Sequence, residues 1–192
     1  MLNSNGNLIT EENARLMIES GLDALYVGID AFTEETYKKY RIGGELKNVV
    51  DNVLMYKELL KKYGSSNQKL FVQYVVMEGN SQELNQFIEF WKNEEIPLKI
   101  RPMVSWAGRI EAKNLDATLE RVPCFIGLDT MAIITNGKVG MCAADLECSV
   151  VVGDITTQTI EEVWNGELKE FRRKHLNREF DNLPEFCRKC MD

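Results

Sequence analysis

The sequence predicts an α/β protein in which a parallel sheet is followed by a smaller region of different texture. Three apolar runs of strand length, residues 25–29, 71–77 and 97–100, are separated by stretches in which apolar residues recur at helical spacing. Strands that alternate with helices indicate a parallel sheet covered by helices, either an open doubly wound sheet or part of a barrel. After Trp106 the alternation stops, and a stretch of mixed charge follows.

Polar residues and glycines mark where the helices of the first region begin and end. Thr10 and Ser81 each precede acidic or amide residues at the start of a helix-like stretch, and both are expected to be N-caps. Gly21 and Gly64 follow such stretches, at places where a left-handed residue commonly ends a helix.

The second region is predicted to open with a β-hairpin. Two short runs, residues 132–135 and 138–141, flank Asn136-Gly137, the dipeptide that most strongly favours a two-residue turn. A small β element therefore begins here.

One helix is predicted after this β element. Thr159, followed three residues later by Glu162, has the pattern of a capping box, and helical spacing continues towards Leu176. The cationic cluster at residues 172–174 lies late in this helix, where it complements the negative end of the helix dipole. The single histidine, His175, lies beside these charges and is expected to face solvent.

Charge and composition exclude several classes of function. The 192-residue chain has a net charge of −7, which disfavours nucleic acid as the main partner because phosphate binding uses clustered Lys and Arg. No run approaches the roughly 18 apolar residues of a membrane span, and the first ten residues lack the order of a secretory signal. We therefore expect a cytoplasmic protein without a membrane partner, in a compartment where disulfides are rare.

Four of the five cysteines are spaced like metal ligands. Cys187 and Cys190 form a CxxC pair, Cys142 follows the predicted hairpin, and Cys124 precedes it. A CxxC pair can place two thiolates on one metal or cluster, and a hairpin can present another beside it. Spacing alone leaves zinc and an iron–sulfur cluster both open, because each takes four thiolates. Cys148 is interpreted as a buried thiol.

Several segments of the chain together resemble one known enzyme family. In the second region these are CFIGLDTMAIITNGKVGMCAAD, VVGDITTQTIEEVWNGELKEFRR and CRKC, and in the first they are NSNGNLIT, LYVGIDAFTEETYKKYRIGG and VQYVVMEGNSQEL. The set resembles the radical S-adenosylmethionine (SAM) enzymes that carry a C-terminal auxiliary-cluster domain of the SPASM or twitch kind. The first-region segments resemble the third, fourth and fifth strands of that family's barrel.

The resemblance implies a fold and its domain boundaries. It implies the later half of a partial (β/α) barrel of radical SAM type over residues 1–106, a linker over 107–123, and a small α+β cluster domain over 124–192.

The resemblance also implies site residues. Cys124, Cys142, Cys187 and Cys190 match the ligands of the family's auxiliary 4Fe–4S cluster, and one such cluster is expected.

The remaining candidates implied by the resemblance are polar positions near strand ends and one acid. Gly28 and Asp30, after the fourth strand of the family barrel, and Asn80, after the fifth, are candidates for contact with SAM. A serine common in the family is replaced by Gly28. Asp30 could equally cap the following helix, and Asn80 could be a turn residue. Asp145 is the candidate catalytic base, since some peptide-modifying members use an aspartate immediately after the matching cysteine; here the aspartate is three positions on, after Ala143-Ala144.

One departure from the family governs the expected function. The CxxxCxxC motif, whose three cysteines hold the SAM-cleaving cluster, is absent from these 192 residues. The chain alone is therefore expected to be inactive in SAM cleavage, and the missing N-terminal half of the barrel is an expected partner. In the full enzyme we expect SAM as cofactor and a peptide, protein or small molecule as substrate. The alternative is a zinc-stapled structural or interaction module.

Overall fold

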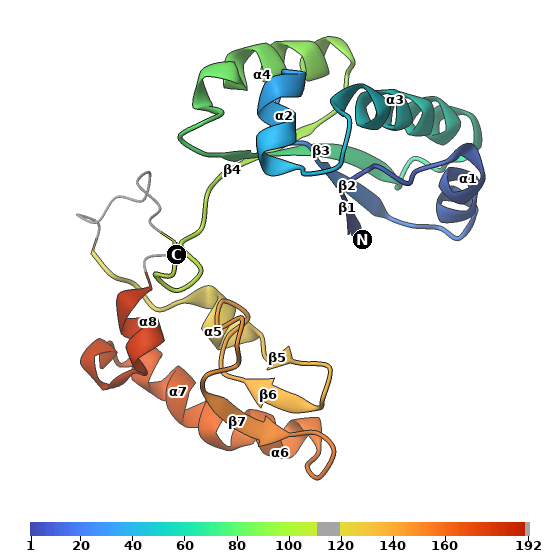
Figure 1. The fold of residues 1–192 in the computed structure, drawn as a ribbon. Helices are drawn as coiled ribbons and strands as arrows, with labels where there is room; N and C mark the ends of the chain where they lie inside the picture. The colour runs from blue at the N-terminus through green and yellow to red at the C-terminus, as the bar shows by residue number, and fades with distance from the viewer. Residues whose placement is uncertain (111–119, 191–192) are drawn as a thin grey trace. The chain divides into compact units, whose positions relative to one another are not determined.

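The computed structural model describes residues 1–110 and 120–190, which fall into two compact units, Met1–Met103 and Val104–Asp192 (Figure 1). Residues 111–119, which belong to the expected linker, lie outside the described residues, as do 191–192. Among the described helices, none combines the length and the apolar character needed to cross a membrane.

The first unit is built on a four-stranded parallel sheet. Its strands are β1 (Leu2–Ser4), β2 (Ala24–Gly28), β3 (Lys69–Val76) and β4 (Leu98–Pro102). The strands lie in the order β1-β2-β3-β4, and every neighbouring pair is parallel. A doubly wound sheet reverses its strand order, whereas a barrel keeps the order of the chain. The sheet is therefore a segment of a (β/α) barrel.

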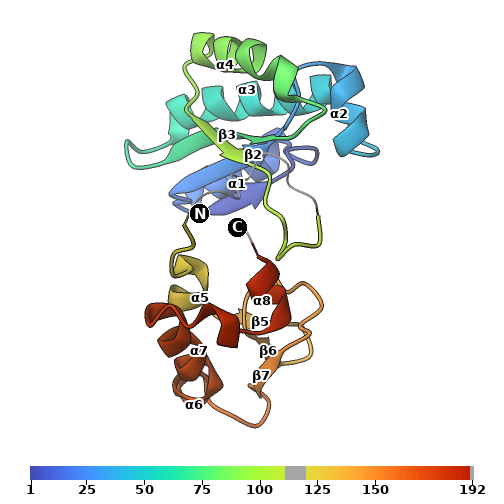
Figure 2. The same cartoon turned by 90° about the vertical axis from the view of Figure 1, so that its left-hand side faces the viewer.

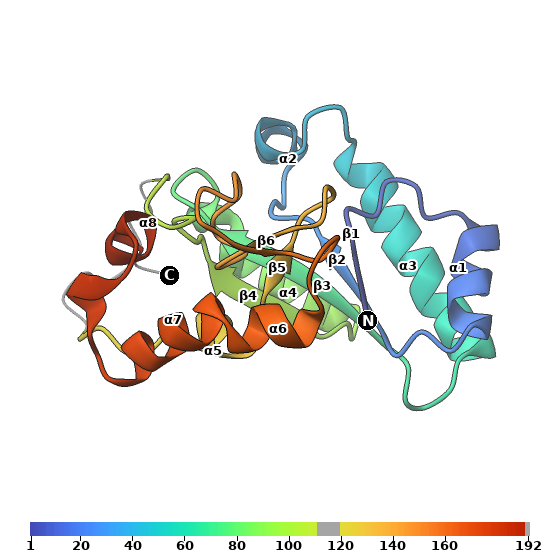
Figure 3. The ribbon, with the colours of Figure 1, turned by 90° about the horizontal axis from the view of Figure 1, so that it is seen from below.

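Helices cover one face of this sheet (Figure 2). They are α1 (Glu11–Glu19), α2 (Glu34–Tyr40), α3 (Leu46–Tyr63) and α4 (Leu84–Asn93), with a short 3₁₀ turn, η1 (Ser81–Glu83), before α4. Figure 3 shows α1 and α3 side by side. Alternate strand residues such as Val27 and Val72 are fully buried against Val49 and Phe87 of these helices, because side chains of a strand point to opposite faces.

The expected helix ends are confirmed in part. Thr10 caps α1, its Oγ1 accepting a hydrogen bond from the Asn13 amide at 3.3 Å, and Gly21 is left-handed with φ of +78°. Ser81 is not an N-cap: it lies inside η1, and α4 begins only at Leu84. Gly64 is extended, with φ of −80° and ψ of 167°, so the chain leaves α3 straight.

In its described residues, the second unit holds a three-stranded antiparallel sheet and four short helices. The strands are β5 (Ala132–Ile133), β6 (Lys138–Gly140) and β7 (Val151–Asp154), in that order, and the helices are α5 (Phe125–Asp129), α6 (Ile160–Asn165), α7 (Glu167–Leu176) and α8 (Glu185–Lys189). A 3₁₀ turn, η2 (Phe180–Asn182), separates α7 from α8. The predicted hairpin is confirmed, with Gly137 at φ of +86° in the turn between β5 and β6.

The helix predicted after this sheet is interrupted. The capping box of Thr159 and Glu162 is present, but Gly166, with φ of −84° and ψ of −126°, ends α6 and separates it from α7.

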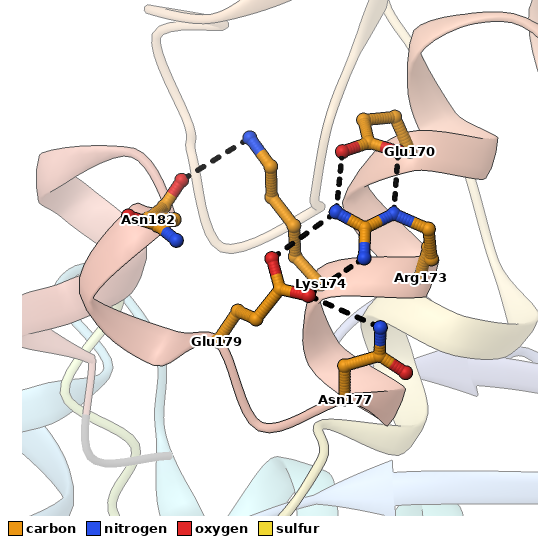
Figure 4. A network of polar contacts seen from close by, with 6 residues as sticks. All are labelled: Glu170, Arg173, Lys174, Asn177, Glu179 and Asn182. Atoms are coloured by element: carbon orange, nitrogen blue, oxygen red, sulfur yellow. Dashed lines mark hydrogen bonds and ion pairs between the residues drawn. The ribbon is translucent and has the colours of Figure 1, made fainter.

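A polar network holds the C-terminal end of α7 to the turn that follows. Figure 4 shows its members, Glu170, Arg173, Lys174, Asn177, Glu179 and Asn182. Arg173 donates to Glu170 from Nε at 2.8 Å and to Glu179 from Nη1 at 2.6 Å, and Lys174 Nζ donates to the Asn182 carbonyl at 3.3 Å. The bonds from Arg173 and Asn177 lower the pKa of Glu179 to about 2. The late cations of α7 thus bind side chains and carbonyls as well as lying at its negative end.

Candidate metal centre and strand-end cavity

A cavity of about 380 Å³ lies at the carboxyl ends of the strands of the first unit. Its lining residues are Asn3, Ser4, Asn5, Gly28, Asp30, Arg41, Gln73, Val75 and Arg101. In barrels and open α/β sheets this edge is where ligands bind, because the loops that follow the strands converge there. Two of the predicted site residues, Gly28 and Asp30, are therefore beside one cavity.

Asp30 is held in place by both of its carboxylate oxygens. Oδ1 accepts a hydrogen bond from the Val75 amide at 2.7 Å, and Oδ2 pairs with the Arg41 guanidinium. Asp30 is 6% exposed and adopts a left-handed φ of +62°. It does not cap the next helix, since Thr33 is the N-cap of α2. The carboxylate instead bonds the end of β2 to β3 and holds the Arg41 guanidinium beside the cavity.

Gly28 provides the space for that cation. A Cβ on Gly28 would lie 2.9 Å from Nη2 of Arg41, so a larger residue would push the guanidinium away from Asp30. Sequence reasoning missed Arg41 and also Arg101 of β4, the second cation of the cavity. Arg41 lies eleven positions after its partner, beyond α2, so no local pattern marks the pair.

Asn80 lies behind the cavity and is not among its lining residues. Its side chain is completely buried: Nδ2 donates to the carbonyls of Asp30 at 2.8 Å and Val75 at 3.0 Å, and Oδ1 accepts from the Met77 amide at 2.7 Å. The amide therefore braces the ends of β2 and β3. Its backbone also makes a turn, with N–H bonded to the Met77 carbonyl at 3.2 Å.

Glu83 anchors the segment just after Asp30, and sequence reasoning missed it. Its buried carboxylate accepts hydrogen bonds from the amides of Phe32 and Thr33 and from the hydroxyls of Thr33 and Thr36. Burial would raise the pKa of Glu83, but these bonds outweigh it and the pKa is lowered. The carboxylate is thus ionised at neutral pH.

Glu83→Gln is expected to destabilise the first unit by about 1–3 kcal/mol, because an amide NH₂ would face donors that need an acceptor. A lowered folded pKa gives stability above the unfolded value of about 4.3, which is lost as pH falls through the folded value. Denaturant unfolding at pH 7 and at lower pH measures both effects: the difference between variant and parent should shrink on acidification. Glu89→Gln, exposed on α4, is the matched control. An equal effect of the two changes at pH 7 would contradict the anchor role.

The four cysteines predicted as ligands all lie in the second unit. Cys124 is the N-cap of α5, Cys142 follows β6, Cys187 lies in α8 and Cys190 ends that helix. All five cysteines of the chain are thiols.

Burial and neighbouring charges shift the pKa values of two of these thiols. Burial raises the pKa of Cys187 to about 11, with Arg121 opposing this and the charges of Cys190, Cys124 and Cys142 adding to it. Burial also raises the pKa of Cys142, against a hydrogen bond from the Ala144 amide. Four thiolates this close repel one another, and a bound cationic centre would offset the repulsion. Within residues 1–110 and 120–190, no three His, Cys, Asp or Glu side chains converge closely enough to hold a single metal ion.

His175 and Arg121 lie against Cys187. The expectation that His175 faces solvent is wrong: it is 1% exposed, packed between Phe171 and Phe180, and its Nε2 lies 3.4 Å from the Cys187 sulfur. Burial, and to a lesser degree the charge of Arg121, lowers the pKa of His175. The helical period of α7, with Leu168, Phe171 and His175 on one buried stripe, is the signal that could have placed it.

Asp145 orders the loop between β6 and β7. Its Oδ2 accepts from the Ser149 hydroxyl at 2.8 Å and the Val150 amide at 3.0 Å, and Arg109 lies 3.9 Å from Oδ1. Burial acts to raise the pKa of Asp145, but the bonds from Ser149 and Val150 prevail and the pKa is lowered. Oδ1 is buried and has no hydrogen-bond partner within the part of the chain that the structure describes.

Cys148 belongs to the packing of this loop. Its side chain is 7% exposed, and a Cβ on Gly140 would lie 3.1 Å from its sulfur. The interpretation of Cys148 as a buried thiol agrees with this position.

Two family models match the chain. The model described as "Radical SAM superfamily" matches residues 1–90, and that of SPASM, an "Iron-sulfur cluster-binding domain", matches residues 124–191.

The chain aligns with only part of the length of each curated relative. An uncharacterized protein of Treponema pallidum (strain Nichols) is 27% identical over 97 residues, 50% of this chain and 27% of the relative. GTP 3′,8-cyclase of Limosilactobacillus fermentum (strain NBRC 3956 / LMG 18251) is 29% identical over 99 residues, 51% of this chain and 28% of the relative. The match thus spans little more than a quarter of these relatives.

Solved structures share the fold. "Native anSMEcpe with bound AdoMet" has a TM-score of 0.62 at 17% identity, covering 97% of this chain and 63% of that one. A histidine-tagged form of anSMEcpe, also with bound AdoMet, has a TM-score of 0.62 at 15% identity, covering 97% and 60%. Residues 1–90 thus match the radical SAM superfamily and residues 124–191 match the SPASM iron–sulfur cluster-binding domain, and the two solved structures share the fold of the chain.

Proposed function

We propose that Cys124, Cys142, Cys187 and Cys190 hold one auxiliary 4Fe–4S cluster, and that the chain is the C-terminal part of a radical SAM enzyme. The observation that carries the proposal is that all four thiols lie within the segment matched by the iron–sulfur domain model, where burial raises the pKa of Cys187 and the charges of Cys190, Cys124 and Cys142 add to that effect. Cys148 is committed to packing against Gly140 and is left out of the set. A cluster offers each thiolate an iron of its own, so its ligands need not converge on one point.

The donor set fits such a cluster. Its members are thiols, which become thiolate ligands when metal binds, and N–H groups already point at two of the sulfurs. The Ala144 amide donates to Cys142 at 3.4 Å, and Arg121 approaches the Cys187 sulfur at 3.6 Å. The bound cluster would supply one-electron transfer, and the chain's own residues hold it, exclude water and place hydrogen-bond donors around it.

We further propose that the strand-end cavity takes part of SAM. Asp30, Arg41 and Arg101 present one anionic and two cationic groups there, which suits a zwitterionic cofactor. Gly28 leaves room for Arg41, and Asn80 is proposed to act through Asp30, whose carbonyl it binds. The neighbours named with bound AdoMet support this use of the fold.

The substrate of the full enzyme is proposed to be a peptide, a protein or a small molecule, with the N-terminal half of the barrel as the necessary partner. The GTP 3′,8-cyclases among the relatives are named for a small-molecule substrate. Asp145 remains the proposed base. Its lowered pKa keeps the carboxylate ionised, and Oδ1 is the oxygen that takes no hydrogen bond within the described residues.

Metal analysis tests the central proposal. After anaerobic reconstitution we expect about four irons and four sulfides per chain, with the brown colour of an iron–sulfur protein, because a four-thiolate site of this kind suits such a cluster. Iron, sulfide and zinc are measured on one sample together with its visible spectrum. One zinc per chain with no visible absorbance would contradict the proposal and favour a zinc-stapled module.

A further inference from the structure

His175 joins two of the proposed ligands through its two ring nitrogens. Nδ1 lies 3.4 Å from the backbone nitrogen of Cys124, which donates to it, and Nε2 lies 3.4 Å from the sulfur of Cys187. The ring is 1% exposed, so water does not compete for either nitrogen.

The contact with Cys124 decides which nitrogen carries the proton. A backbone N–H offers only a hydrogen, so Nδ1 must be the acceptor. A neutral imidazole with an accepting Nδ1 carries its proton on Nε2, and this proton points at the Cys187 sulfur. In a protonated, charged imidazole Nδ1 would also carry a hydrogen, which would face the N–H of Cys124 and could not accept its hydrogen bond.

Arg121 adds a second donor at the same sulfur. Its Nη2 donates to the Cys187 carbonyl at 2.6 Å and lies 3.6 Å from the sulfur, while the guanidinium lies over the Phe180 ring at 4.8 Å. The carbonyl bond and the ring contact fix the guanidinium, so its approach to the sulfur is built into the fold.

We propose that His175, with Arg121 as second donor, is a positioning residue that donates a hydrogen bond from Nε2 to the Cys187 sulfur and so raises the reduction potential of the bound cluster. The inference rests on the proposed function, because it takes Cys187 as a cluster ligand. One-electron reduction by a chemical reductant such as dithionite breaks no bond and adds negative charge that the sulfurs share. N–H donors stabilise that charge and therefore favour the reduced form.

The first test uses the unaltered chain. Since His175 is the single histidine, ¹⁵N-labelled histidine gives one pair of ring signals. We expect the Nε2–H tautomer at neutral pH, both in the metal-free chain and with diamagnetic zinc bound. An Nδ1–H tautomer would overturn the proposal, because the ring could then not donate to the sulfur.

The second test separates the two nitrogens by substitution. In His175→Asn the amide can replace Nδ1 but does not reach the sulfur, whereas in His175→Gln it can replace Nε2. After reconstitution, His175→Asn is expected to lower the ratio of reduced to oxidised cluster about tenfold at a fixed potential, a shift of about 59 mV for one electron. His175→Gln should restore most of it. The potential is read by EPR during redox titration.

Arg121→Gln is expected to shift the potential in the same direction. Arg188→Gln removes the same charge one residue from Cys187 and is the matched control, with little shift expected. Equal potentials in the parent, His175→Asn and Arg121→Gln would overturn the proposal while leaving the cluster in place. A full cluster in Cys187→Ala would instead overturn the ligand assignment, so the two failures are distinguishable.

Discussion

Replacing Cys124, Cys142, Cys187 or Cys190 singly by Ala is expected to abolish the 4Fe–4S cluster. Each replacement removes one of the four proposed thiolate ligands, so one iron of the cluster loses its protein ligand. Iron and sulfide per chain and the visible spectrum, after identical anaerobic reconstitution, measure the loss.

Cys148→Ala is the matched control, because it removes a thiol from the same domain without touching the proposed set. It should retain the full iron content. Loss of the cluster from Cys148→Ala, or retention in any one of the other four, would show that the ligand set is wrong. Circular dichroism of all five variants separates a missing ligand from a chain that fails to fold.

The 192-residue chain, reduced with dithionite and given SAM, is expected to form no 5′-deoxyadenosine above background. Reductive cleavage requires an electron delivered through an iron that also binds the cofactor, and the resemblance assigns that iron to a CxxxCxxC motif that these residues do not contain. The proposed cluster has four thiolate ligands, so each of its irons is already bound. Chromatography of the reaction mixture over several hours measures the product.

Adding a chain that carries the N-terminal strands and CxxxCxxC should restore product formation if the strands pair. In that restored system Gly28→Val is expected to weaken SAM binding, since the valine side chain would displace Arg41. Multiple turnovers by the 192 residues alone would contradict the assignment of all four cysteines as ligands of one closed cluster.

Features encoded in neighbouring residues are predictable from the sequence. The strands at β2, β3 and β4, the hairpin at Asn136-Gly137 and the capping box at Thr159 all depend on residues a few positions apart, and the structure confirms them. The expectation of a left-handed Gly64 is wrong because a glycine after a helix is free to be extended, and here the chain runs on towards β3.

The candidate sites are predictable as residue types but not as contacts. Gly28 and Asp30 can be named from the strand end, whereas Arg41 reaches them from beyond a helix and Glu83 from about fifty residues away. The prediction for His175 is wrong because it relied on the charged residues beside His175 in the sequence. The helical spacing, which places His175 on the buried stripe of α7, is the better guide. Long-range hydrogen bonds leave no periodic trace in a sequence, which is why these partners emerge only from the structure.

The two outer strands of the parallel sheet differ in how they resist self-association. β4 carries Lys99 and Arg101 and ends in Pro102, which has no N–H to offer, and charge and proline are devices that keep exposed strand edges from recruiting other chains. β1, Leu2–Ser4, carries neither. The edge of β1 can therefore pair with a further parallel strand. We expect self-association of the sheet to occur at β1 rather than at β4.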